Sequence, residues 1–317
     1  MNTLWRHWRL IVFGLACVAA ISPAAGSERP QQQRVQHFAP NANFNAKGDF
    51  LPAKAGFDIA DVSSRHELDL LPDGVKGLVW IGQCDGVDTK FETLARAVID
   101  HPKLFGFYLM DDPDPTGLWR PQCKASDLRA ESDWIHQRRP EAVTFVALMN
   151  LGSSASPRFS ADYKPERSHI DLFGVAPYPC RTHWPKCHYD MIDRFVGASR
   201  DAGVPLNRIV PTYQAFGGGD WSTDSGDAYR LPSAFELWSI LKRWHRLIPA
   251  PAFDYAYSWG QQRSDACLAA SADLQAVFAR HNLARSWRQM QPQRRRGREA
   301  DGPRSKIVFD PRERSPI

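Results

Sequence analysis

Three acidic residues follow directly on an apolar run of the chain. Residues 105–110 read Phe-Gly-Phe-Tyr-Leu-Met, and Asp111, Asp112, Pro113 and Asp114 come next. Carboxylates held this close raise one another's pKa, so one can keep a proton near neutral pH beside an ionised neighbour. The segment therefore predicts a general acid and a general base. The same residues could instead cap a turn or bind a structural cation.

Polar and aromatic residues also follow the other apolar runs. A parallel barrel opens the carboxyl ends of its strands onto one face, so side chains there should gather around one mouth. We expect Asp61 or Asp114, or the loop residue Asp220, to supply a second catalytic carboxylate beside Asp112 and Asp111. The predicted substrate-binding residues are Asn150, Tyr178, Tyr213, Gln214, Trp221 and Trp259.

The elements that position these residues alternate between short β-rich runs and amphipathic helical stretches, which is typical of βαβ units and a parallel sheet. Helix signals include Asp88 before a helix, Ser233 with Glu236 as a capping box, and Gly203 at a left-handed cap. The predicted strands are 57–62, 77–81, 104–110, 143–150, 170–176, 208–214 and 253–259.

The predicted fold is α/β, a TIM barrel of the (β/α)8 type. Seven strands are one too few, so either one strand lies before Gly56 or the sheet is incomplete. A doubly wound dinucleotide-binding sheet is disfavoured because no Gly-x-Gly-x-x-Gly turn follows the first strand. Gly217–Gly219 lacks the Lys-Ser/Thr of a phosphate loop, and we expect no cofactor.

Four stretches of the chain resemble the TIM-barrel glycoside hydrolase superfamily. These are residues 108–113 with the acidic pair and Pro113, residues 170–179 ending in Pro-Tyr-Pro, residues 211–214, and residues 255–259. The resemblance spans about residues 56–283. It implies that Asp112 protonates the leaving glycosidic oxygen, with Asp111 beside it, and that Tyr178, Tyr213, Gln214 and Trp259 line a sugar subsite.

One late strand departs from that superfamily. Where the commonest clan of barrel glycosidases carries a Glu nucleophile, this chain has Trp259-Gly260-Gln261-Gln262. The second carboxylate must then come from elsewhere, and its distance from Asp112 would separate inverting from retaining hydrolysis.

The sequence thus predicts a hydrolase of O-glycosidic bonds in a polysaccharide or cell-surface glycan. Two other functions remain open. The protein could be a carbohydrate-binding barrel without catalysis, or a calcium-dependent wall-associated protein that uses Asp111, Asp112 and Asp114 as oxygen ligands.

The two ends of the chain differ from its middle. Residues 1–26 have the basic start, apolar run and small residues of a cleaved signal peptide, which predicts a secreted or periplasmic protein without a membrane anchor after cleavage. Residues 27–55 are expected to be an irregular leader, residues 56–284 the barrel domain, and residues 285–317 a disordered basic tail.

Without its ends the chain has a net charge of −3, so we expect no nucleic-acid binding. Nothing in the sequence indicates an oligomeric state.

Five cysteines remain after signal cleavage, and export favours their oxidation. We predict the disulfides Cys180–Cys187 and Cys84–Cys123, with Cys267 as the buried or free thiol. Cys180-x-x-His183 and Cys187-His188 offer zinc-ligand residue types, but so compact a loop would strain a tetrahedral site, and no metal is expected there.

Overall fold

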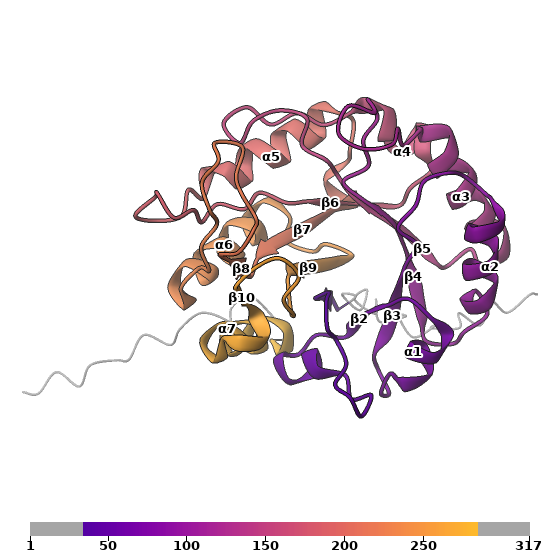
Figure 1. Cartoon of the computed structure of the whole chain (residues 1–317), viewed down its shortest axis with the longest axis horizontal. Coiled ribbons are helices and arrows are strands. Elements are labelled where there is room, and N and C mark those ends of the chain that lie inside the picture. The colour runs from indigo at the N-terminus through magenta and orange to yellow at the C-terminus, as the bar shows by residue number, and fades with distance from the viewer. Residues whose placement is uncertain (1–33, 285–317) are drawn as a thin grey trace, which may run out of the picture. The chain divides into compact units, whose positions relative to one another are not determined.

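Eight parallel strands close into a barrel in the computed structural model, which describes residues 34–284 (Figure 1). Strand β1 pairs in parallel with both β2 and β9, so the sheet has no free edge. The predicted (β/α)8 barrel is confirmed. The strands around it are β1 (Gln36–Phe38), β2 (Ile59–Val62), β3 (Lys76–Trp80), β4 (Leu104–Asp111), β5 (Val143–Ala147), β6 (Leu172–Val175), β7 (Ile209–Gln214) and β9 (Phe253–Tyr257).

All seven predicted strands are present, with ends that differ by up to three residues. The eighth is β1, which lies within the stretch 27–55 that we expected to be an irregular leader, so the barrel begins before Gly56. Strand β1 gives no periodic signal because it has three residues, of which Phe38 is the one that joins the inner apolar layer. The predicted signal peptide and basic tail lie outside the described residues.

Helices surround the strands on the outside of the barrel (Figure 1). The predicted caps are confirmed: the Asp88 and Ser233 side chains each accept a backbone N–H, and Gly203 has a φ of +91°. The helices are α1 (Arg65–Leu70), α2 (Thr89–Val98), α3 (Ala125–Arg138), α4 (Pro165–Ser168), α5 (Asp190–Asp201), α6 (Ala234–Leu247) and α7 (Ala272–Leu283). A two-stranded antiparallel sheet joins β8 (Phe216–Gly217) to β10 (Ala266–Cys267).

Two apolar layers hold the barrel together. The outer layer fills the space between strands and helices, and Trp244 and Phe278 are fully buried there. The inner layer is rich in aromatic rings, because Phe145 contacts Tyr108, Phe253 and Tyr255 with centroid distances of 4.7, 5.1 and 6.3 Å. This inner layer is the floor beneath the carboxyl ends of the strands.

Both predicted disulfides, Cys84–Cys123 and Cys180–Cys187, are present, and Cys267 is a buried free thiol. Cys84 follows β3 and Cys123 ends the segment between β4 and α3, so the first bridge ties two neighbouring loops at the carboxyl ends of the strands. No helix within residues 34–284 is long and apolar enough to cross a membrane.

The double variant Cys84→Ser/Cys123→Ser should lower the free energy of unfolding by about 2–4 kcal/mol, since the bridge closes a loop with a sequence separation of 39. Denaturant titration would measure this loss. The control is Cys180→Ser/Cys187→Ser, whose separation is 7 and whose loss should be about 1.5 kcal/mol smaller by loop-closure entropy. Equal losses would contradict this account.

Candidate active site

The carboxyl ends of the strands open into a cleft made of two adjoining hollows. Their volumes are about 430 and 330 Å³, and both are lined by Asp111, Tyr255 and Tyr257. The first hollow is also lined by Asn41, Phe44, Asp61, Glu67, Trp80, Tyr108 and Gln262. The second is also lined by Asp112, Asn150, Tyr178, Arg181, Trp221, Asp224 and Tyr229. Asp111 therefore stands where the two hollows meet.

A β-bulge in β4 aims Asp111 into the cleft. Tyr108 points into the barrel, and strict alternation would make Met110 the next residue to point inward. The pairing of β4 with β5 shifts register between Tyr108 and Met110, so Met110 instead packs on the outer layer. The bulge thus turns Asp111 toward the mouth of the barrel.

Asp112 occupies a left-handed backbone conformation just past the end of β4. Its φ is +47°, and its N–H donates to the carbonyl of Ala147 on β5 at 2.9 Å. About 47% of the side chain is exposed, through the cleft. The walls of the cleft partly desolvate the Asp112 carboxyl, which raises its pKa, and the charge of Asp111 raises the pKa further, to about 7. Asp112 can therefore hold a proton at neutral pH.

Asp111 has two partners that favour its ionised form. Burial raises its pKa above the ordinary range, but the hydroxyl of Tyr108 donates to Oδ1 at 2.9 Å and the charge of Arg120 acts in the same direction. Arg120 Nη1 donates to the backbone carbonyl of Asp111 at 3.0 Å, and its Nη2 lies 4.0 Å from Asp112 Oδ2. The two aspartates thus lie in unequal environments, which suits an acid beside a base.

Replacing Tyr108 with phenylalanine should move the acidic limb of the pH–rate profile upward by about 1 pH unit. The lost hydroxyl stabilises the charged Asp111, so its pKa rises and the ionised form disappears at a higher pH. The measurement is kcat/KM against pH on any substrate that the protein is found to cleave. Tyr178→Phe is the matched control, because Tyr178 lines the second hollow and should leave that limb in place.

Asp61 is a third carboxylate of the cleft. It points from β2 into the first hollow, and its Oδ2 accepts the N–H of Asn41 at 3.0 Å. Burial raises the pKa of Asp61, the hydrogen bond from Asn41 lowers it and the charge of Glu67 raises it, with a net increase. Asp61 and Asp111 therefore lie on the lining of one hollow, as the sequence predicted for two strand ends.

Asp114, expected as a candidate catalytic residue, lies outside the lining of both hollows. It is fully buried, and it accepts hydrogen bonds from the backbone of Thr116, Trp119 and Arg120 and from the Thr116 hydroxyl. Burial opposes its charge, but these hydrogen bonds outweigh burial and hold its pKa below the usual range. Asp114 thus shapes the loop that carries Arg120 to the Asp111–Asp112 pair. Asp220 is exposed and also lies outside the lining.

Three of the six predicted substrate-binding residues line the second hollow: Asn150, Tyr178 and Trp221. Tyr178 packs edge-on against Phe216 and Tyr229 at centroid distances of 4.8 and 5.8 Å, which fixes the plane of its ring. The Asn150 side-chain oxygen accepts the N–H groups of Gly152 and Arg158, so it also shapes its own loop.

The other three, Tyr213, Gln214 and Trp259, do not line the cleft. Tyr213 points outward from β7 and donates to Asp254 at 3.2 Å. Gln214 is fully buried and bonds the backbone of Cys180 and the carbonyl of Arg230. Trp259 is 1% exposed and lies past the end of β9, where alternation no longer holds. These residues hold the fold around the cleft.

The sequence interpretation missed several cleft residues, among them Trp80, Tyr255, Tyr257 and Arg181. Tyr255 and Tyr257 alternate along β9, and this period of two could have placed both on the inner face. Arg181 is 4% exposed, and its Nη1 donates to Asp224 at 2.8 Å. No local signal predicts that pair, because its members are 43 positions apart.

Within the described residues, the side chains of Asp111, Asp112 and Asp114 do not form a group that could hold one metal ion together. The oxygens of Asp114 already accept four hydrogen bonds. The arrangement therefore does not favour the calcium-dependent alternative. The aspartate pair in the cleft is suited to proton transfer.

Comparisons with known proteins returned similar folds. No family model matches the chain, and no curated protein matches it. Among solved structures, a GH18 chitinase, ChiB, from Flavobacterium johnsoniae is 9% identical, with a TM-score of 0.49 and coverage of 78% of this chain and 94% of that one. The chitinase ChiC of Aspergillus fumigatus is 13% identical, with a TM-score of 0.47 and coverage of 73% and 96%.

A chitinase-like agglutinin from Robinia pseudoacacia is 12% identical to the chain, with a TM-score of 0.47 and coverage of 78% of this chain and 98% of that one. At these identities the likeness concerns the fold alone.

Proposed function

We propose that this protein is a hydrolase of O-glycosidic bonds in a polysaccharide or cell-surface glycan, with Asp112 as the proton donor. The observation that carries the proposal is that Asp111 stands at the junction of two hollows lined by aromatic rings, with Asp112 beside it on the lining of the second. A protonated carboxyl beside an ionised one, at the open end of a barrel, is the arrangement that cleavage of a glycosidic bond requires.

In the proposed reaction Asp112 transfers its proton to the glycosidic oxygen as the bond from that oxygen to the anomeric carbon breaks. The anomeric carbon then accepts a water oxygen, and the water loses a proton to an ionised carboxylate. Asp61 is our candidate for the carboxylate that accepts this proton, because it lines the first hollow together with Asp111, and the charge of ionised Asp111 would stabilise the positive charge that develops on the anomeric carbon. Arg120 helps to hold the aspartate pair in place.

The rings of the cleft indicate a ligand of at least two sugar units. Trp80 lines the first hollow, Tyr178 and Trp221 line the second, and Tyr255 and Tyr257 line both. Aromatic faces stack on the apolar faces of pyranose rings, while polar side chains between them bind hydroxyl groups. A glycan that spans both hollows would place the bond between its units beside Asp111 and Asp112.

A second function, carbohydrate binding without turnover, is favoured by one residue. Gln262 lines the first hollow after the late strand, and its amide oxygen accepts from the Tyr257 hydroxyl at 2.5 Å. An amide can bind a sugar hydroxyl but cannot act as a nucleophile or base. The catalytic proposal therefore depends on Asp61 and the aspartate pair.

We also propose that the protein acts in an exported compartment, secreted or periplasmic. Two disulfides support this, because bridges persist in oxidising compartments.

The test is a screen of the purified protein on aryl glycosides and polysaccharides, with products identified by mass spectrometry and Asp112→Asn run in parallel. We expect shortened glycans from the wild type and none from the variant. Glycan binding by both proteins without any product would instead establish the binding function. Products at equal rates from both proteins would exclude Asp112 as the acid.

A further inference from the structure

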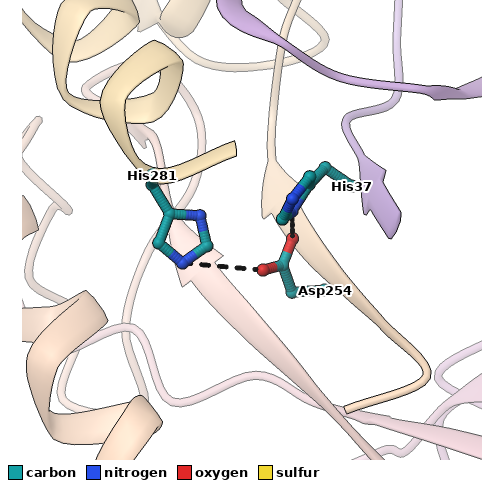
Figure 2. A group of neighbouring side chains, drawn as sticks. All are labelled: His37, Asp254 and His281. Atoms are coloured by element: carbon teal, nitrogen blue, oxygen red, sulfur yellow. Dashed lines mark hydrogen bonds and ion pairs between the residues drawn. The ribbon is translucent and has the colours of Figure 1, made fainter. Parts of the chain in front are cut away.

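We propose that His37, Asp254 and His281 form a zinc site at the seam where the barrel closes, distinct from the cleft. His37 lies on β1, Asp254 on β9 and His281 on α7. One potential ligand atom from each lies within 4.8 Å of the other two. Figure 2 shows Asp254 between the two imidazole rings, with one carboxylate oxygen toward each.

The three side chains are buried between the barrel wall and α7. Their exposed fractions are 5% for His37, 3% for Asp254 and 10% for His281. Asp254 Oδ1 lies 2.8 Å from His37 Nδ1, and Oδ2 lies 3.8 Å from His281 Nε2 and accepts from the Tyr213 hydroxyl at 3.2 Å. A carboxylate this deep in an apolar layer needs cationic partners.

Hydrogen bonds fix which nitrogen of His281 carries a hydrogen. Asn282 Nδ2 donates to the carbonyl of Ala55 at 3.0 Å, so its Oδ1 faces His281 Nδ1 at 2.8 Å. An amide oxygen only accepts, and Nδ1 must therefore be the donor. In neutral His281 the lone pair on Nε2 then points at the Asp254 carboxylate.

A positive species between these two facing acceptors would stabilise both of them. A proton would draw them to about 2.7–3.2 Å, whereas Nε2 and Oδ2 are 3.8 Å apart. An ion about 2.0–2.2 Å from each atom fits that separation. The hydrogen bonds from Asn282 and Tyr213 would act as the outer contacts that orient metal ligands.

The ligand set determines which ion we propose. Two imidazole nitrogens and one carboxylate oxygen are ligands that zinc accepts, whereas calcium and magnesium prefer oxygen alone. Binding requires the hydrogen on His37 Nδ1 to move to Nε2 or leave. The ion would link the first strand, the last barrel strand and the last described helix.

This link would stabilise a weak part of the barrel. Strand β1 has three residues, and its register with β2 is a single pair, Phe38 with Ile59. Its other neighbour, β9, carries Asp254 directly opposite His37. A zinc ion across that pair, anchored by His281, would hold β1 in place.

The experiment uses the untagged full chain, dialysed against a chelator and then against zinc. We expect one zinc per chain by elemental analysis, and a melting temperature about 5 °C higher at zinc concentrations a hundredfold above Kd. Cobalt in place of zinc, with a water molecule as the fourth ligand, should give the visible absorption of a four-coordinate site. His281→Gln should abolish the bound zinc and the melting shift.

The matched control is His101→Gln, because His101 is also buried and bonds one aspartate, Asp69, at 3.0 Å. This variant should bind zinc as the wild type does. Wild-type protein without bound zinc, without a melting shift and without cobalt absorption would overturn the proposal even if His281→Gln failed to fold. Equal zinc binding by His281→Gln would also overturn it, and no result here depends on glycan cleavage.

Discussion

Replacing Asp112 with asparagine should reduce kcat/KM for glycan cleavage by about 10²–10⁴-fold, because the variant has no proton to give the departing oxygen. KM should change little, since asparagine keeps the size and hydrogen-bonding capacity of the side chain. The measurement is initial rate against concentration for any substrate found in the screen. For an aryl glycoside with an acidic leaving group, the fall in kcat/KM should be smaller, because such a group can depart with little help from a proton donor.

The asparagine variant should fold normally, which makes the loss of activity interpretable. Asp112 has a φ of +47°, and asparagine tolerates the left-handed region better than most residues. The substitution also removes a carboxylate whose charged form is disfavoured beside Asp111. We expect a melting temperature equal to or above that of the wild type at pH 8. A large drop would show that Asp112 has a structural role instead.

The wild-type protein should have a bell-shaped pH–rate profile for the proposed glycan cleavage. Activity should fall above pH of about 7, where the aspartate pair loses the proton that Asp112 donates. It should also fall on the acidic side, where Asp111, whose pKa is raised above its ordinary value by burial, becomes protonated. Asp112→Asn should remove the upper limb. A plateau that extends well above neutral pH in the wild type would contradict this assignment.

Replacing Phe145 with alanine should lower the free energy of unfolding by about 3–5 kcal/mol. Phe145 is fully buried in the inner layer, against Tyr108, Phe253 and Tyr255, so truncation loses burial and leaves a cavity at the barrel centre. Activity should also fall, since Tyr108 rests on this ring and donates to Asp111. Denaturant titration measures the first effect.

The control for that loss is Phe145→Leu, which fills more of the same space and should cost less. If alanine were tolerated with a loss under about 1 kcal/mol, the inner aromatic layer would not be the support that we describe.

Most of the fold could be predicted from the sequence, because seven strands are long apolar runs that alternate with amphipathic helices. Strand β1 could not, since three residues are too few to show a period of two. Asp61, Asp111 and Asp112 could be placed at the open end of the barrel because each lies at or next to the carboxyl end of a strand. This rule predicts the end of the barrel at which a residue lies, but not the direction of its side chain.

The rule fails where tertiary contacts decide the direction of a side chain. Tyr213 and Gln214 both end β7, yet Gln214 bonds loop backbone of Cys180 and Arg230. The bulge in β4 that turns Asp111 inward depends on pairing with β5, which no local pattern encodes. Sequence reasoning found the acidic segment, but it could not predict that Asp114 would be buried by the loop that follows it.

The pairing of β1 with β9 has a consequence for biogenesis. Gln36–Phe38 must pair with Phe253–Tyr257, more than 200 positions later in the chain, before the barrel can close. Contacts this distant in sequence slow folding, and a chain interrupted before residue 257 would retain two open edges that invite intermolecular pairing. Productive closure must therefore wait until nearly the whole domain has emerged from the ribosome.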